Sequence, residues 1–141
     1  MSDLKDKIYE VIKDLQLAGF ATVTEDGKPW VRYVMTAGSE GLTIRFATFV
    51  TARKVAQIKK NPDVHLTCGV TEPQTPAPYV QIQGRARFTT EESERHGFWC
   101  DMLSGIFKGP DDPNYGVIIV EPYRIEYCTP GSFEPDVWTA D

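Results

Sequence analysis

The sequence predicts a mainly β domain with flanking helices, in which short antiparallel strands close fully or partly into a barrel. Three observations support this fold class. Apolar and polar residues alternate over about six or seven short segments. Polar turns of roughly two to five residues separate these segments, and the strands do not alternate with helices as they would in a parallel sheet. A two-sheet sandwich is the alternative that the same pattern allows.

Length, composition and charge limit the class of protein. A chain of 141 residues with 41% hydrophobic and 25% charged residues is typical of one globular domain, here 1–141. The formal net charge of -5 argues against a general nucleic-acid binder, which would neutralise phosphates with a basic surface. No apolar run approaches the ~20 residues that cross a bilayer. Since Cys68, Cys100 and Cys128 lack zinc-site spacing, we expect a reduced, cytoplasmic protein.

The first part of the chain predicts one helix followed by three strands. Apolar residues at spacings of three and four predict an amphipathic helix over 3–18. From residue 20 the period changes to two, which predicts strands over 20–24 and 31–35 around an Asp26-Gly27 hairpin turn. A third strand is expected over 42–48, after a turn bounded by glycines.

The second part of the chain predicts two shorter helices among the remaining strands. Thr51 is the expected N-cap of a helix over 52–60. Residues 89–92 have the form of a capping box for a second helix, which is expected to continue to Leu103. Gly84 is expected to mark a bulge or a close approach of another backbone. The other strands are expected over 64–70, 79–88, 117–120 and 124–127.

Signatures of hydrolases and of metal sites are missing from the sequence. It contains no G-x-S-x-G, H-E-x-x-H or Walker lysine motif. His65 falls within an apolar strand and His96 on the polar side of a helix, and neither has the partners that triad chemistry requires. No metal-ligand spacing is visible. Asp111-Asp112 falls in a Gly/Pro turn, where turn formation explains it better than acid–base catalysis.

The segment from Phe46 to Lys54 is the most informative for function, because a strand ends there and a helix begins with two adjacent cations. Free backbone N–H groups at a helix start attract anions. The Arg53 guanidinium can bind two phosphate oxygens, and Lys54 adds a point charge. The hydroxyls of Thr48 and Thr51 would complete a phosphate site. In the alternative interpretation, Arg53 and Lys54 are only the solvated first turn of a surface helix.

A second candidate is Arg32, which lies on the same strand face as Trp30 and Val34. An arginine on a half-buried apolar face needs an anionic or hydrogen-bonding partner. That partner is either a ligand or an acidic residue across the hairpin, such as Glu25 or Glu40.

The order of these motifs resembles that of the FMN-binding split-barrel superfamily, and within it the general-stress-protein type of protein related to pyridoxamine 5'-phosphate oxidase. The resemblance covers nearly the whole chain, and it depends on the ordered set, since no single motif is diagnostic. The motifs are Phe20-Ala-Thr-Val-Thr24, Asp26-Gly27-x-Pro29, Val31-Arg32-Tyr33-Val34, Ile44-Arg-Phe-Ala-Thr48, Ala52-Arg53-Lys54, Asn61-Pro62, the strand around Gly84, and Val120-Glu-Pro-x-Arg124-Ile-Glu-Tyr127.

The resemblance implies a six-stranded antiparallel split β-barrel and a homodimer with two flavin sites between its subunits. It assigns the FMN phosphate to Arg53 and Lys54, and a phosphate or flavin contact to Arg32. It also implies that the strand ending at Thr48 lines the flavin ring. The candidate cofactor-binding residues are Arg32, Tyr33, Val34, Ala47, Thr48, Thr51, Ala52, Arg53 and Lys54.

The implied function is that of an FMN-dependent oxidoreductase that acts on a small-molecule substrate. The chain differs from the true oxidases at Cys128, where they have a tryptophan, and in the tail from Gly131, which lacks their Arg-x-His substrate motif. The substrate therefore stays open. One alternative is a non-catalytic stress protein that binds flavin or haem, and a deazaflavin is a further ligand class. Another is a small barrel for single-stranded nucleic acid, which the acidic charge disfavours.

Overall fold

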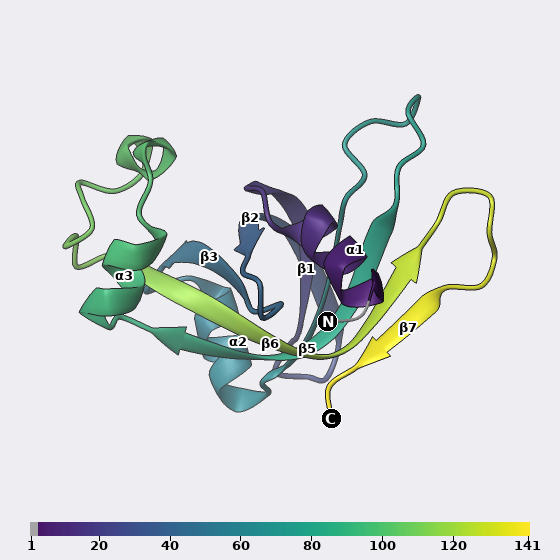
Figure 1. Ribbon diagram of the computed structural model, residues 1–141. Coiled ribbons are helices and arrows are strands. Elements are labelled where there is room, and N and C mark those ends of the chain that lie inside the picture. Colours follow the sequence, from purple (N-terminus) through teal and green to yellow (C-terminus); the bar gives the residue numbers. More distant parts are fainter. Residues whose placement is uncertain (1–2) are drawn as a thin grey trace.

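Six antiparallel strands close into a barrel in the computed structural model, which describes residues 3–141 (Figure 1). The strand order is β3-β2-β1-β4-β5-β6, and β3 also pairs with β6, which completes the ring. The predicted six-stranded barrel is therefore confirmed. The strands are β1 (Gln16–Val23), β2 (Pro29–Gly38), β3 (Ile44–Phe49), β4 (Asp63–Cys68), β5 (Tyr79–Thr89), β6 (Tyr115–Cys128) and, outside the ring, β7 (Asp136–Thr139).

The first helix is shorter than its apolar spacing predicts. The expected helix over 3–18 is wrong in its last part, because α1 (Asp3–Ile12) ends at Ile12 and β1 begins at Gln16. All eight residues of β1 pair with β2, and this long-range pairing overrides the local helical pattern. The Asp26-Gly27 turn is confirmed, since Gly27 has a φ of 80° that glycine adopts without steric cost.

β6 is one strand of 14 residues, whereas the sequence predicts two strands separated at Pro122. The prediction is wrong because the register of β5 and β6 shifts beside Gly84, opposite Pro122, and a bulge tolerates a residue without an N–H. The expected close approach at Gly84 is confirmed. A Cβ atom there would lie 2.7 Å from Val120 Cγ1 and 3.0 Å from the Glu121 carbonyl oxygen.

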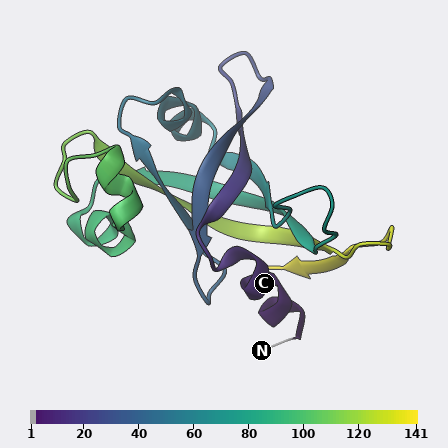
Figure 2. The ribbon, with the colours of Figure 1, turned by 90° about the horizontal axis from the view of Figure 1, so that it is seen from above.

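β6 shares one of its edges between two partners. Its first half pairs with β3 and its second half with β7, while β5 runs along the opposite edge. The sequence did not predict β7, whose Trp138 is half-buried against the barrel core. In both views β7 lies at one end of the long β5–β6 pair and α3 at the other (Figures 1 and 2).

Two apolar clusters hold the elements together. The interior of the barrel is one continuous core, to which α1 contributes Ile8 and Ile12, and α2 (Arg53–Lys60) contributes Val55 and Ile58. A second cluster includes outward-facing residues of β3 and β6, and it attaches the segment after β5 to the barrel. Its buried members are Leu103, Phe107, Tyr115, Val117 and Ile119.

Helices α2 and α3 (Glu92–Phe98) begin without a side-chain cap. The N-cap of α2 is Ala52, so the expected cap by Thr51 is wrong, and the capping box at 89–92 is wrong as well because the N-cap is Glu91. The Thr89 hydroxyl instead accepts the Glu91 N–H at 3.0 Å, two residues away. The Thr89 hydroxyl therefore bonds to the backbone just before the helix and does not cap it.

The helix expected to reach Leu103 breaks after Phe98. The chain is extended at Cys100 and then forms a short 3₁₀ helix, η1 (Asp101–Gly105). The break lets the Trp99 ring pack edge-on against Tyr115, with 5.6 Å between the ring centroids. Packing on β6 therefore outweighs helix continuation, and the α3–η1 segment covers the outer face of β3 and β6.

The cysteines Cys68, Cys100 and Cys128 are all unpaired. Burial raises the pKa of the Cys68 thiol to about 11, which keeps it protonated at neutral pH. Within residues 3–141, none of the helices combines the length and the apolar character that crossing a membrane requires.

Candidate functional site

Three cations, Arg32, Arg53 and Lys54, gather where α2 begins beside the barrel. The Arg32 guanidinium donates hydrogen bonds to the Thr22 hydroxyl at 2.7 Å and to the Gln57 side-chain oxygen at 3.1 Å. Both acceptors are neutral. Among residues 3–141, no carboxylate forms an ion pair with any of the three cations.

The acidic partners considered for Arg32 across the hairpin are not its partners. Glu25 instead lies 3.7 Å from the Lys60 ammonium, and Glu40 is exposed in the turn between β2 and β3. The acid-paired interpretation of Arg32 is therefore wrong. Its positive charge is held by hydrogen bonds alone, and it remains uncompensated.

Burial and mutual repulsion both act on the pKa values of this cluster. Burial lowers the pKa of Lys54, and the charge of Arg32 lowers it further. Burial also lowers the pKa of Arg32, to which Arg53 adds its repulsion. The pKa values of Lys54 and Arg32 are both lowered because no nearby anion compensates their charged forms. A phosphate dianion placed between these side chains would stabilise the charged forms of Arg32, Arg53 and Lys54.

The start of α2 adds backbone donors to the same cluster. Its first two N–H groups have no partner within the helix, and no side chain caps them, while the third, of Val55, donates to the Ala52 carbonyl. Its first turn contains no acidic residue but two cations, Arg53 and Lys54, although a helix start ordinarily favours negative charge. The helix start therefore presents both N–H groups and cations, as an anion-binding site requires.

A cavity of about 260 Å³ lies next to the cations, between the β1–β2 hairpin, the end of β3 and the α3–η1 segment. Thr48 and Lys54 stand at its polar side, with 3.5 Å between the Lys54 ammonium nitrogen and the Thr48 hydroxyl oxygen. The opposite wall is apolar and comes from the α3–η1 segment and the residues after it. It consists of Phe98, Met102, Leu103, Ile106 and Phe107.

The structure brings together part of the predicted cofactor-binding set. The cavity is lined by Tyr33, Val34, Ala47, Thr48 and Lys54.

The other four predicted residues lie outside this cavity. Arg32 lies on the other side of the cluster, next to Gln57. The Arg53 guanidinium lies over the Trp30 ring, 6.0 Å from its centroid. Thr51 is exposed, and Ala52 packs against the barrel core.

Comparison with known proteins assigns the chain to a family. The family model described as pyridoxamine 5'-phosphate oxidase matches residues 4–129. The chain belongs to the pyridoxamine 5'-phosphate oxidase family. It is 32% identical over 133 residues to general stress protein 26 of Bacillus subtilis (strain 168), which covers 94% of each chain.

Solved structures agree with this family assignment. The general stress protein 26 of Bacillus anthracis str. Sterne superposes with a TM-score of 0.84 at 26% identity, covering 99% of this chain and 100% of that one. A Clostridium acetobutylicum protein related to general stress protein 26 has a TM-score of 0.76 at 17% identity, covering 96% and 92%, and shows the fold alone.

Two groups of site residues were not predicted from the sequence. Thr22 and Gln57 hold Arg32, and Gln57 could have been found from its position one turn after Arg53 on the same helix. The sequence did not predict that residues from Phe98 to Phe107 form an apolar wall of the cavity, because their spacing is typical of the apolar face of an ordinary helix. Only the packing of the α3–η1 segment against β3 and β6 brings them to the cavity.

The chain also has a wide apolar groove on the outer face of β1, β2 and β4. Its volume is about 900 Å³, and Arg32 and Tyr33 lie along it. Apolar side chains on this face are largely exposed, among them Tyr33 at 80%, Val31 at 65% and Leu17 at 60%. Such a contiguous apolar face is unusual for a surface that contacts only water.

Proposed function

We propose that the chain is a flavoprotein that binds FMN, with Arg32, Arg53 and Lys54 around the phosphate, and that it functions as an oxidoreductase. The observation that carries this proposal is the cluster of three cations without a carboxylate partner, placed beside an apolar cavity. A phosphate dianion supplies the missing charge. A planar aromatic ring suits the apolar walls.

The residues of this chain would bind and orient the cofactor. The cations and the start of α2 would hold its phosphate, while Val34, Ala47 and the α3–η1 wall would exclude water from the ring. When bound, FMN supplies hydride and electron transfer, which the side chains cannot perform. No pair of carboxylates or histidines lines the cavity among the described residues, in agreement with a protein that leaves the redox chemistry to its cofactor.

The apolar groove supports a homodimer as part of the same proposal. An exposed face that includes Tyr33, Val31 and Leu17 would be buried by a second copy of the chain. Because Leu17 and Tyr33 line both this groove and the cavity, a dimer would place the flavin close to the subunit interface. Sedimentation velocity at micromolar concentration is expected to show a dimer, and Tyr33→Asp is expected to shift it toward monomer.

The proposal is tested by titrating the purified chain with FMN. We expect quenched flavin fluorescence, a shifted visible spectrum and one FMN per subunit. Equal titrations with a deazaflavin and with haemin decide among the ligand classes. Retention of FMN fluorescence at every protein concentration, with no spectral shift, would refute the assignment.

A non-catalytic flavin carrier is the second candidate, because the cation cluster and the apolar cavity account for flavin binding alone. The two functions differ in how the bound flavin responds to a reductant. Under anaerobic conditions, rapid bleaching of the flavin by NADH or NADPH supports an oxidoreductase. A flavin that binds tightly but resists both donors supports a carrier.

A further inference from the structure

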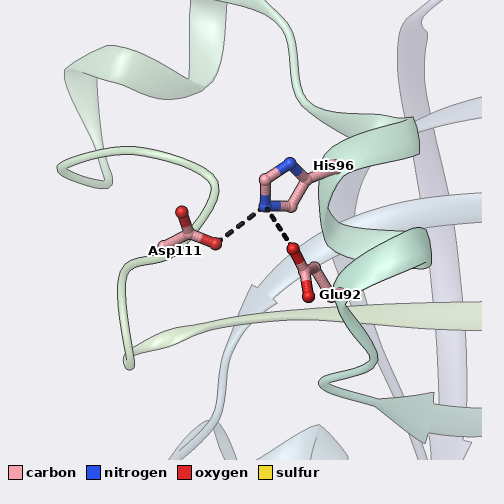
Figure 3. Close-up of side chains that lie close together, drawn as sticks. All are labelled: Glu92, His96 and Asp111. Atoms are coloured by element: carbon pink, nitrogen blue, oxygen red, sulfur yellow. Dashed lines mark hydrogen bonds and ion pairs between the residues drawn. The ribbon is translucent and has the colours of Figure 1, made fainter.

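We infer that Glu92, His96 and Asp111 form a binding site for one divalent transition-metal ion of the Zn²⁺ class. Their side chains converge from α3 and from the turn that follows η1 (Figure 3). His96 Nε2 lies 2.7 Å from Asp111 Oδ1 and 4.0 Å from Glu92 Oε1. All three ligand atoms lie within 4.8 Å of one another.

These separations suit a tetrahedral ion. With metal–ligand bonds of about 2.0–2.2 Å, neighbouring ligand atoms of a tetrahedral site lie about 3.4 Å apart. The two distances to His96 Nε2 lie on either side of this value. Because all three side chains are exposed, small rotations are enough to bring their ligand atoms to equal spacing around an ion.

The backbone holds these ligands in place before any ion binds. Glu92 and His96 are one turn apart on the same face of α3. The turn that carries Asp111 is fixed by its neighbour Asp112, whose carboxylate accepts two backbone N–H groups at 2.9 Å each. This confirms the predicted turn-forming role for Asp112, whereas the Asp111 carboxylate bonds to His96. Arg95 ties the turn to α3 by donating to the Pro110 carbonyl at 2.7 Å.

The donor set decides the class of ion. One imidazole nitrogen and two carboxylate oxygens suit Zn²⁺ and its neighbours in the first transition row, whereas Ca²⁺ and Mg²⁺ prefer oxygen alone. Two carboxylates also supply the negative charge that a dication requires. The Arg95 guanidinium, 3.7 Å from Asp111, opposes the cation and limits its affinity. Solvent exposure leaves the remaining coordination positions to water.

The metal site lies at the two ends of the segment that lines the cavity. An ion bound there would join α3 to the turn after η1, and so fix both ends of the segment between Phe98 and Asp111. That segment supplies the apolar wall of the cavity. Metal binding is therefore expected to stabilise the wall, whichever cofactor the cavity accepts.

The test uses the full chain without an affinity tag, stripped of metal with a chelator and titrated with Zn²⁺ by calorimetry. We expect one ion per chain, and at least about a tenfold weaker affinity for His96→Gln and for Asp111→Asn. Glu91→Gln is the matched control, since it removes one exposed negative charge next to Glu92 from a residue that is not a ligand. It is expected to bind like the wild type.

A second titration with Co²⁺ separates this site from the free thiols. Co²⁺ on imidazole and carboxylates lacks the charge-transfer band that a cysteine ligand such as Cys100 produces. Wild-type affinity in His96→Gln, or a thiolate band in the wild type, would overturn the inference, as would no heat of binding at millimolar Zn²⁺. Circular dichroism of each variant checks that its fold is retained. Since no flavin is present, these outcomes are independent of the proposed function.

Discussion

The ammonium nitrogen of Lys54 lies 3.5 Å from the hydroxyl oxygen of Thr48, so the first turn of α2 reaches back to the end of β3. Thr48 is buried at 4% exposure, and Lys54 carries a charge without an acidic partner in the described chain. This relationship joins the strand that lines the cavity to the helix start that can bind an anion. In the proposed FMN site, it is the geometric link between the phosphate and the ring.

Replacing Arg53 by alanine is expected to weaken FMN binding by at least about tenfold while leaving riboflavin binding nearly unchanged. A charged hydrogen bond contributes roughly 1.5–3 kcal/mol, and only FMN carries the phosphate that would receive it. Fluorescence titrations with both flavins measure the difference. Lys28→Ala, in the exposed β1–β2 turn, is the matched control for the loss of one positive charge. Equal losses for FMN and riboflavin would assign Arg53 a structural role only.

Replacing Lys54 by methionine is expected to change stability and binding in opposite directions. The variant removes a half-buried charge whose pKa is lowered by burial and by Arg32, while methionine keeps the length of the side chain. We expect the free energy of unfolding without ligand to rise by up to about 1 kcal/mol, and FMN affinity to fall at least about tenfold. Urea denaturation and flavin titration measure the two effects. A variant that loses stability and keeps its FMN affinity would contradict the anion-site interpretation.

His65 is expected to make the stability of the protein depend on pH. Burial lowers its pKa below the ordinary 6.5, although the nearby Glu126 opposes this shift. The unfolded chain therefore binds a proton at a higher pH than the folded chain does. The resulting stability is fully present above pH 6.5 and is lost as the pH falls through the lowered folded-state pKa.

The measurement is the urea midpoint of the wild type and of His65→Gln between about pH 7 and pH 5. The wild type is expected to lose more stability than the variant over this range. Parallel curves for the two proteins would show that His65 titrates alike in the folded and unfolded states.

Substitution of Gly84 by alanine is expected to destabilise the barrel by about 1–3 kcal/mol. The new methyl group would press on Val120 and on the Glu121 backbone at the bulge between β5 and β6. Gly41→Ala is the matched control, because nothing lies within 4 Å of a Cβ atom there. Thermal unfolding of both variants checks the prediction, and a Gly84→Ala midpoint equal to that of Gly41→Ala would contradict it.

Local signals were sufficient for much of the fold. The Asp26-Gly27 turn and the period-two segments located the strands, because a turn with positive φ and a half-buried strand each leave a pattern within a few residues. Local signals failed where distant contacts decide. The helix expected over 3–18 became strand from Gln16 onward through pairing with β2, and Pro122 was accommodated by a bulge that depends on Gly84 in another strand.

The sequence by itself determined the chemistry of the candidate site, because charge and hydrogen-bonding groups belong to single residues such as Arg32, Arg53 and Lys54. Only the tertiary structure decided how those groups are used. It gave Arg32 neutral partners in place of an acid, brought the α3–η1 segment to the cavity, and placed Asp111 beside His96. Those relationships join residues that are far apart in the chain, and only the packing of the folded chain fixes the distances between them.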